Sequence, residues 1–597
     1  MFRIDYSKLS LEQVKSIVAK AGAPACAGEK SACLAGEKLK LVLDNEGITP
    51  PELEYDFISA DELVVRENGE SFRCGYGALT LKDIVLFAHM IPGTLRGYTV
   101  ILARDTGIAT VEEMWFIDYQ GQEIDTSEKP LTIFDLAQIG FFVNREVERQ
   151  IYKGYFVREG MDAPEKRFEK GLRLDNKMIY WEDDLGRKRV FTYISNFFST
   201  MVEVDTPDGE DVISLPSDYL QISDNLFFYS VGEVEYSGRL SIEVFDLFTM
   251  RKIGVTMGID ENDEFEFSLY SAKGRYLGQY ATFYDFDDLG RDEPSHMASR
   301  LGTPVKGARG TYRTSVLARK MSEEDIIELS KKELNIFDFS ENNTMITPEL
   351  RMADSRECVG KKLTFRDDNG YEVDIDFVTE TMLRFRRKGG EWTEQEYRAA
   401  QLDEHLVFLG FHIADSVPSA CIISAIDFDN GCATVMDSHF CGGYEPHDIL
   451  TDYHFGYIVM DGLTPPRTRR HGFTRELLGR YFTWSYSKGV TSQHIYNAPN
   501  SYSWTIFMGG ETGRGRGGYV WSSPCTYIKL RDDVYIMTWM EEKWAGTMGS
   551  IAMNLPLMHD VGFNMNIKYD GSVMGFKELS ALARDAGKCN MDGIYKL

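Results

Sequence analysis

An internal repeat is the feature that most constrains how this chain folds. Residues 36–47 and 360–370 have similar sequences. The first begins Gly-Glu-Lys-Leu and the second Gly-Lys-Lys-Leu, and each reads as a strand that runs into a turn containing Asp, Asn and Gly. Residues 154–164 and 456–466 both begin with Gly-Tyr, carry a second glycine six residues later, and then contain proline. Because self-similarity at long spacing indicates duplicated structural units, the chain is predicted to contain the same two-domain unit twice.

The repeat predicts four domains in the order N1, C1, N2 and C2. The expected boundaries are a helical leader at 1–35, N1 at 36–135, C1 at 150–290, a linker with a helix at 291–354, N2 at 355–440 and C2 at 450–580.

The hydrophobic pattern inside the units has a period of two. Val373–Phe377 and Phe482–Tyr486 both alternate, and turn residues recur at short, regular intervals. This pattern is typical of antiparallel sheets. Helical spacing is confined to 11–21 and 323–334. We therefore expect an all-β protein with up to four closed antiparallel barrels, arranged as two two-barrel units with short connecting helices.

The charge balance narrows the choice of partners. The chain carries 93 acidic and 65 basic residues, a net charge of −28. Such a surface repels phosphate backbones and anionic lipids, so we expect no nucleic-acid and no membrane partner. No stretch approaches the ~18 apolar residues of a spanning helix, and the N-terminus lacks the segments of a signal peptide. We expect a cytoplasmic protein whose nine scattered cysteines are reduced.

The histidines and cysteines do not form a metal-binding pattern. The nearest approach is His439, Cys441, His447 and His454, whose spacings match neither a structural zinc site nor an H-E-x-x-H helix. The chain also lacks a Gly-x-x-x-x-Gly-Lys-Ser/Thr nucleotide loop. We therefore predict no metal and no cofactor.

Three segments of C2 carry a family resemblance. Tyr453–Tyr457, Thr474–Gly479 and Gln493–Tyr496 resemble the C-terminal domain of the molybdenum cofactor biosynthesis F (MoaF) family, a calycin-like, lipocalin-like barrel. N2 is similar to the N-terminal barrel of that family, and N1 with C1 looks like a diverged second copy. The resemblance implies tandem calycin-like barrels over nearly the whole chain.

A more distant similarity suggests a chemistry. C2 resembles phenolic acid decarboxylase, which also has a small calycin-like barrel. The resemblance places Tyr486 on a carboxylate-binding tyrosine, Glu541 on the proton-transferring glutamate, and either Arg514 or Arg516 on the pocket arginine. Trp484 replaces a second pocket tyrosine. The matching pieces are Thr483–Gly489, the arginine turn and Val534–Glu541.

The strand pattern of C2 is compatible with acid/base chemistry. In a strand over 534–541, Tyr535, Trp539 and Glu541 share one face. If that face lines a barrel interior, burial raises the pKa of Glu541 into the range of a general acid or base; the alternative is a rim carboxylate paired with Lys543. His494 is either a hydrogen-bonded core residue or an assisting catalyst. The candidates are catalytic Glu541, His494, Tyr486, Arg514 and Arg516, and substrate-binding Trp484, Tyr481, Tyr496, Trp504 and Trp539.

C1 retains only part of this set. Leu226–Glu233 aligns with Val534–Glu541, so C1 keeps a glutamate at Glu233. Asp183 stands in place of Tyr486, and no matching arginine is present. A single active site would therefore lie in C2.

We expect a cofactor-independent lyase, a decarboxylase or dehydratase-like enzyme, that acts on a small aromatic or phenolic acid in C2. The alternatives are a non-catalytic lipocalin-like protein that binds a small hydrophobic ligand, and an isomerase or cyclase that uses the same residues. The pattern also leaves a homodimer open.

Overall fold

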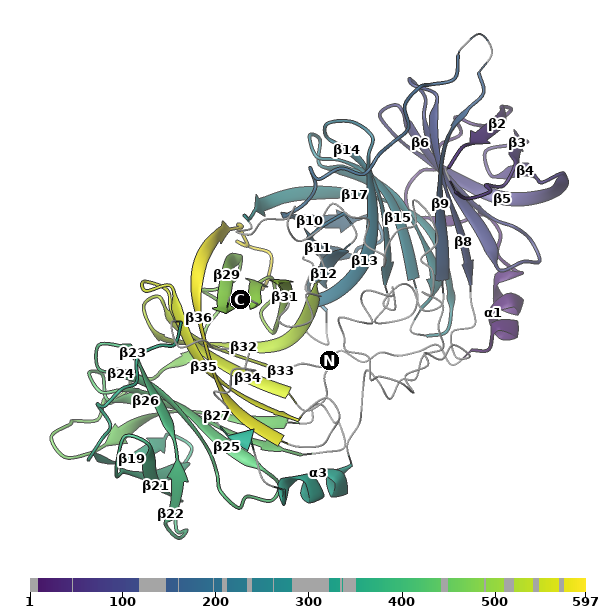
Figure 1. Ribbon diagram of the computed structural model, residues 1–597. Helices are drawn as coiled ribbons and strands as arrows, with labels where there is room; N and C mark the ends of the chain where they lie inside the picture. Colours follow the sequence, from purple (N-terminus) through teal and green to yellow (C-terminus); the bar gives the residue numbers. More distant parts are fainter. Residues whose placement is uncertain are drawn as a thin grey trace.

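The computed structural model describes residues 9–45, 47–116, 147–158, 160, 162–196, 198–206, 212–233, 239–260, 262–281, 322–332, 335–336, 350–441, 449–487, 490–508, 520–540, 547–567 and 574–596. They form four sheets that are closed or nearly closed into barrels, and all strand pairs are antiparallel except two pairings made by two-residue strands. This confirms the all-β fold class. In Figure 1 the barrels lie in a row in the order N1, C1, C2, N2, with the two C barrels in the middle.

N1 is a closed eight-stranded barrel. Its strands are β2 (Lys38–Leu43), β3 (Leu53–Phe57), β4 (Glu62–Glu67), β5 (Glu70–Leu81), β6 (Ile84–Met90), β7 (Arg96–Ala103), β8 (Ile108–Phe116) and β9 (Val147–Phe156). N2 repeats this order, with the counterpart of β5 divided in two. Its strands are β19 (Lys362–Asp367), β20 (Glu372–Phe377), β21 (Met382–Arg387), β22 (Thr393–Glu396), β23 (Arg398–Asp403), β24 (Leu406–His412), β25 (Ala420–Asp427), β26 (Cys432–Phe440) and β27 (Ile449–Val459).

In C1 and C2 one long last strand pairs with both the first and the last-but-one strand of the barrel. C1 contains β1 (Ala25–Cys26), β10 (Lys177–Asp183), β11 (Lys188–Tyr193), β12 (Phe198–Glu203), β13 (Val212–Gln221), β14 (Leu226–Glu233), β15 (Arg239–Asp246), β16 (Arg251–Ile259) and β17 (Phe265–Gln279). C2 contains β18 (Asn335–Ile336), β28 (Gly472–Phe473), β29 (Arg480–Ser487), β30 (Val490–Ile495), β31 (Ser501–Met508), β32 (Trp521–Arg531), β33 (Val534–Met540), β34 (Thr547–Asn554), β35 (His559–Ile567) and β36 (Met574–Lys588).

The N barrels end later than the repeat pattern predicts. The boundaries at 135 and 440 leave β9 and β27 outside N1 and N2, yet these strands close the two barrels by pairing with β2 and β19. The repeated Gly-Tyr pair lies in these strands rather than at the start of C1 and C2. Gly154 pairs with Leu43 and Gly456 with Asp367, so the repeated glycine marks the closure point of each N barrel.

Two short helices occupy equivalent places in the two units. Within the described residues these are α1 (Leu11–Val18) and α3 (Glu323–Ser330), each with a serine capping box. The sequence predicts helices over 11–21 and 323–334, and each observed helix ends a few residues before the predicted end. Helix α1 packs on the N1–C1 contact and α3 on the N2–C2 contact. Neither helix is long and apolar enough to cross a bilayer, and no other described helix is.

The two C barrels pack against each other through equivalent strands. When β14 is aligned with β33, Ser214 on β13 and Ser522 on β32 hold the same position, and their hydroxyl oxygens lie 2.8 Å apart. Tyr280 stacks on Tyr481 in the same contact, with ring centroids 4.4 Å apart. Because the serines at equivalent positions of the two barrels contact each other, the two units are related by an approximate two-fold axis.

Candidate functional site

The interior of C2 is lined mainly by aromatic side chains. On β29, Phe482, Trp484 and Tyr486 face inward because strand residues alternate between faces. Tyr496, directly after β30, and Tyr502 from β31 join them. Further rings come from β32 and β33, so one compact aromatic interior is built from five strands.

Six of the seven described candidate residues converge on this interior. Trp484, Tyr486, Tyr496 and Trp539 are members of the buried cluster, and the rings of Trp484 and Tyr502 lie 6.1 and 5.4 Å from that of His494. Trp504 packs between this interior and the C1–C2 contact, and its Nε1 donates to Ser523 at 3.2 Å.

Tyr481 lies elsewhere. It sits on the opposite face of β29, in the C1–C2 contact, where its hydroxyl donates to Met178 Sδ at 3.3 Å. The structure therefore separates Tyr481 from the barrel interior. Glu541, Arg514 and Arg516 lie outside the described residues, so their assigned roles stay predictions.

His494 is a neutral imidazole rather than one poised to titrate near pH 7. Its Nδ1 lies 3.4 Å from the Tyr496 hydroxyl. Burial lowers the pKa of His494 to about 3, because the surrounding rings cannot solvate an imidazolium. In this environment the ring offers a neutral donor and acceptor for hydrogen bonds.

The buried His494 should make the protein sensitive to acid. An unfolded histidine binds a proton below pH ~6.5 while the native one does not, so stability falls as pH drops from 6.5 toward 3. At ~1.4 kcal/mol per pH unit, His494 accounts for about 3 kcal/mol between pH 6.5 and pH 4. We expect His494→Phe to lose less stability than wild type over this range, measured by urea unfolding at each pH. Parallel curves for the two proteins would contradict the assignment.

A buried carboxyl group that no sequence pattern marks lies in the same interior. Asp560 on β35 is fully buried. Its neighbours Val561 and Phe563 point outward into the N2–C2 contact, so Asp560 faces inward. The Ala581 backbone N–H donates to Oδ1 at 2.6 Å, whereas Oδ2 has no hydrogen-bond partner among the described residues.

Burial also shifts the pKa of Asp560. It raises the pKa of this carboxyl well above its usual range, against the smaller opposing effect of the Ala581 N–H. Burial likewise raises the pKa of Tyr486 and Tyr496, and the nearby Asp560 raises both further. Burial in this interior therefore favours the uncharged forms of the Asp560 carboxyl, the Tyr486 and Tyr496 phenols and the His494 imidazole.

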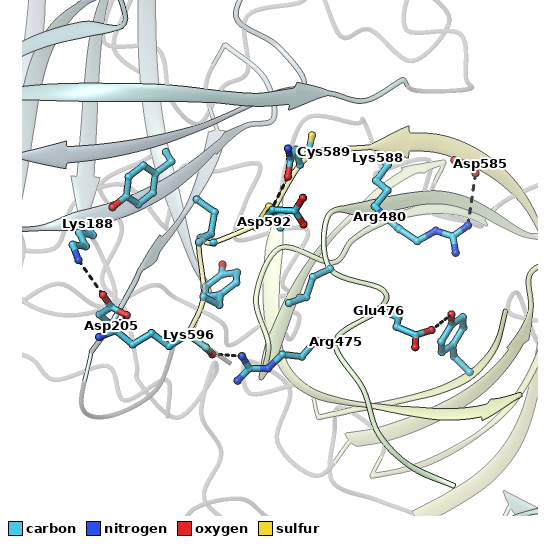
Figure 2. Close-up of a pocket in the computed structure, with 18 of the residues that line it drawn as sticks. Lys188, Asp205, Arg475, Glu476, Arg480, Asp585, Lys588, Cys589, Asp592 and Lys596 are labelled. Atoms are coloured by element: carbon cyan, nitrogen blue, oxygen red, sulfur yellow. Dashed lines mark hydrogen bonds and ion pairs between the residues drawn. The ribbon is translucent and has the colours of Figure 1, made fainter. Parts of the chain in front are cut away.

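A cleft of about 1410 Å³ lies beside this barrel, between C1 and C2 (Figure 2). It is lined by five basic and five acidic residues, so its charges balance. These are Lys188, Arg475, Arg480, Lys588 and Lys596, with Asp205, Glu476, Asp533, Asp585 and Asp592. The C-terminal segment crosses it, and Lys596 and Lys188 both pair with Asp205 at 3.1 Å.

The cleft meets the C2 interior at Tyr535. The Tyr535 ring belongs to the interior cluster, while its hydroxyl donates to Glu476 at 2.8 Å in the cleft. Lys529 donates to the same carboxylate at 2.8 Å. Leu477, next to Glu476, inserts into the interior. The segment that contains Glu476 and Leu477 therefore separates the cleft from the C2 interior.

No three His, Cys, Asp or Glu side chains converge as metal ligands in the part of the chain that the structure describes.

Comparison with known proteins identifies part of the chain. A "Crystal Structure of a putative beta-lactamase from Burkholderia vietnamiensis" aligns over 20% of this chain and 100% of its own, at 16% identity and a TM-score of 0.16. No curated protein matches. The MoaF N-terminal domain matches residues 346–441, and the MoaF C-terminal domain matches residues 471–583. Residues 346–583, which cover N2 and most of C2, therefore carry the two domains of the MoaF family in their N-to-C order.

Proposed function

We propose that C2 is a cofactor-independent lyase, a decarboxylase or dehydratase-like enzyme, that acts on a small aromatic or phenolic acid. The observation that carries the proposal is the convergence of the candidate side chains from β29, β30, β31 and β33 on one aromatic interior. Aromatic rings in edge-to-face or offset contact favour a planar aromatic ligand. Barrels of about eight strands either fill their interior with side chains or hold one small molecule, and the proposal takes the second case for C2.

In this proposal each residue has a separate task. Trp484, Tyr496 and Trp539 bind the ring of the substrate, and Tyr486 donates a hydrogen bond to its anionic group. For a decarboxylase, Arg514 or Arg516 binds the substrate carboxylate, the C–C bond to it breaks to release CO2, and Glu541 supplies the proton that the substrate carbon gains. His494, neutral in this environment, positions the substrate by hydrogen bonding. An isomerase or cyclase would use the same residues.

A non-catalytic binding protein is the second candidate. One observation favours it: in the described interior, burial favours the uncharged forms of His494, Asp560 and Tyr486, which can hold a ligand by hydrogen bonds without any proton transfer. This candidate shares the ligand class with the lyase, so binding alone does not separate them.

Ultraviolet spectra of the protein mixed with 4-hydroxycinnamate or 4-hydroxybenzoate distinguish the two candidates. A lyase changes the conjugation of the substrate, so we expect an absorbance change that continues with time and scales with enzyme concentration. A binding protein gives a change that saturates at one ligand per chain. Spectra that never depart from the sum of the components would exclude both for these acids.

A further inference from the structure

The strand register shows which residue of C1 occupies the position that Asp560 holds in C2. When β14 is aligned with β33, Tyr229 pairs with Glu243 and Glu243 with Gly254, as Met537 pairs with Ile551 and Ile551 with Gly562. Two residues before each glycine stand Lys252 in C1 and Asp560 in C2. Both are buried and face the interior.

In C1 the Lys252 ammonium group has its hydrogen-bond acceptor within its own barrel. Lys252 Nζ donates to both carboxylate oxygens of Glu243, at 2.9 and 3.0 Å, and lies over the rings of Trp181 and Phe191. The Tyr270 hydroxyl donates to the same carboxylate at 2.6 Å. A ligand is therefore not needed to satisfy this lysine.

In C2 the two partners have been replaced by aliphatic residues. The register places Ile551 where C1 has Glu243, and Leu579 where C1 has Tyr270. Asp560 Oδ2 consequently faces the interior without a hydrogen-bond partner among the described residues. Buried polar atoms in folded proteins are nearly always paired, and an unpaired one lowers stability. Such a group calls for a partner beyond the described residues, and a ligand that enters the interior can supply one.

We propose that Asp560 is a ligand-binding residue whose free oxygen, as the neutral acid, donates a hydrogen bond to an anionic oxygen of the ligand bound in C2. This inference rests on the proposed function, and it assigns the specificity for an acid to a residue that no sequence motif marks. A hydrogen bond between a carboxylic acid and a carboxylate is charge-assisted, short and strong. The Ala581 N–H fixes the other oxygen, so the donor is already oriented before the ligand enters.

Two substitutions at Asp560 test this, with 4-hydroxycinnamate and its methyl ester as probes in a fluorescence titration of the full-length protein. Asp560→Asn keeps an acceptor for the Ala581 N–H and presents an N–H donor to the ligand, so we expect the acid to bind within a few-fold of wild type. Asp560→Leu removes the donor, so we expect the acid to bind roughly 10–100-fold more weakly. The ester should lose less, since it lacks the anionic oxygen.

A matched control comes from a second buried carboxyl. Glu578 on β36 is also buried, but it points out of the barrel and accepts hydrogen bonds from Arg351 at 3.0 Å. Glu578→Gln should leave the affinity for the acid unchanged, although it changes stability. An infrared difference spectrum of wild type minus Asp560→Asn at pH 7 should contain the C=O stretch of a protonated carboxylic acid, which a merely structural carboxylate would not show.

The outcomes separate this inference from the proposed function. If wild type binds the acid and Asp560→Leu binds it equally well, only the role of Asp560 is wrong. If Asp560→Asn binds the acid more than ten-fold tighter, Asp560 is an ionised, repelling carboxylate and the inference fails. If wild type binds neither this acid nor 4-hydroxybenzoate, the proposed function and the inference fall together.

Discussion

Replacing Glu541 by glutamine should lower turnover of a phenolic acid by roughly 10²–10⁴-fold with little loss of binding. Glutamine keeps the shape and hydrogen bonding of the side chain but removes the proton that the reaction requires. In sequence, Glu541 follows Tyr535, Met537 and Trp539 at a spacing of two, and all three of those face the C2 interior. The measurement is the initial rate of the ultraviolet change, together with the affinity from equilibrium titration.

Glu233 provides the internal control, because it holds the same position at the end of β14 in C1. Glu233→Gln should leave turnover near the wild-type rate, since the sequence of C1 lacks the tyrosine and arginine that would accompany an active glutamate. Full activity in both variants would show that the glutamate assignment is wrong. Loss of activity in Glu233→Gln alone would place the chemistry in the first unit.

Much of the architecture followed from patterns that a single sequence contains. The duplication predicted two equivalent units, and the period of two predicted antiparallel barrels; both are confirmed. The domain boundaries were less accessible, because a strand carries the same alternation whether it ends one barrel or begins the next. Only the pairing of β9 with β2 and of β27 with β19 shows to which barrel each strand belongs.

The candidate site in C2 was also predicted only in part, because local alternation does not show which distant segments a side chain contacts. Alternation along β29 and β30 correctly grouped Trp484 with Tyr486 and His494 with Tyr496. The same rule places Tyr481 on the opposite face from Trp484, so strict use of the period would have removed it from the substrate-binding set. The contact that holds Tyr481 involves Tyr280, far earlier in the chain, which no local pattern reveals.

Asp560 was missed for a different reason. In sequence it is one acidic residue after a hairpin, in His559-Asp560-Val561-Gly562-Phe563, where a polar residue is ordinarily exposed. Its significance comes from burial and from the aliphatic Ile551 and Leu579 that flank its position. An alignment of the two C barrels by strand register, rather than by motif, would have matched it with Lys252 and marked the change of charge.

Substituting Gly456 by alanine should destabilise N2 by about 3 kcal/mol or more, although the change adds one methyl group. A Cβ at this position would overlap the Arg366 carbonyl oxygen and come within 2.7 Å of the Phe365 ring. The obstacle is backbone of β19, which cannot move aside without opening the pairing that closes the barrel. We expect a lower urea midpoint than wild type, followed by far-ultraviolet circular dichroism.

Two further glycines show whether the effect comes from barrel closure. Gly154 holds the equivalent place in N1, where a Cβ would overlap the Val42 carbonyl oxygen, so Gly154→Ala should be similarly destabilising. At Gly472 in β28, no atom lies within 4 Å of the place that an added Cβ would take, and φ is outside the left-handed region. Gly472→Ala should therefore change stability by no more than about 0.5 kcal/mol. If all three variants unfold at the wild-type midpoint, β27 and β9 do not close the N barrels at these glycines, and the repeated Gly-Tyr pair needs another explanation.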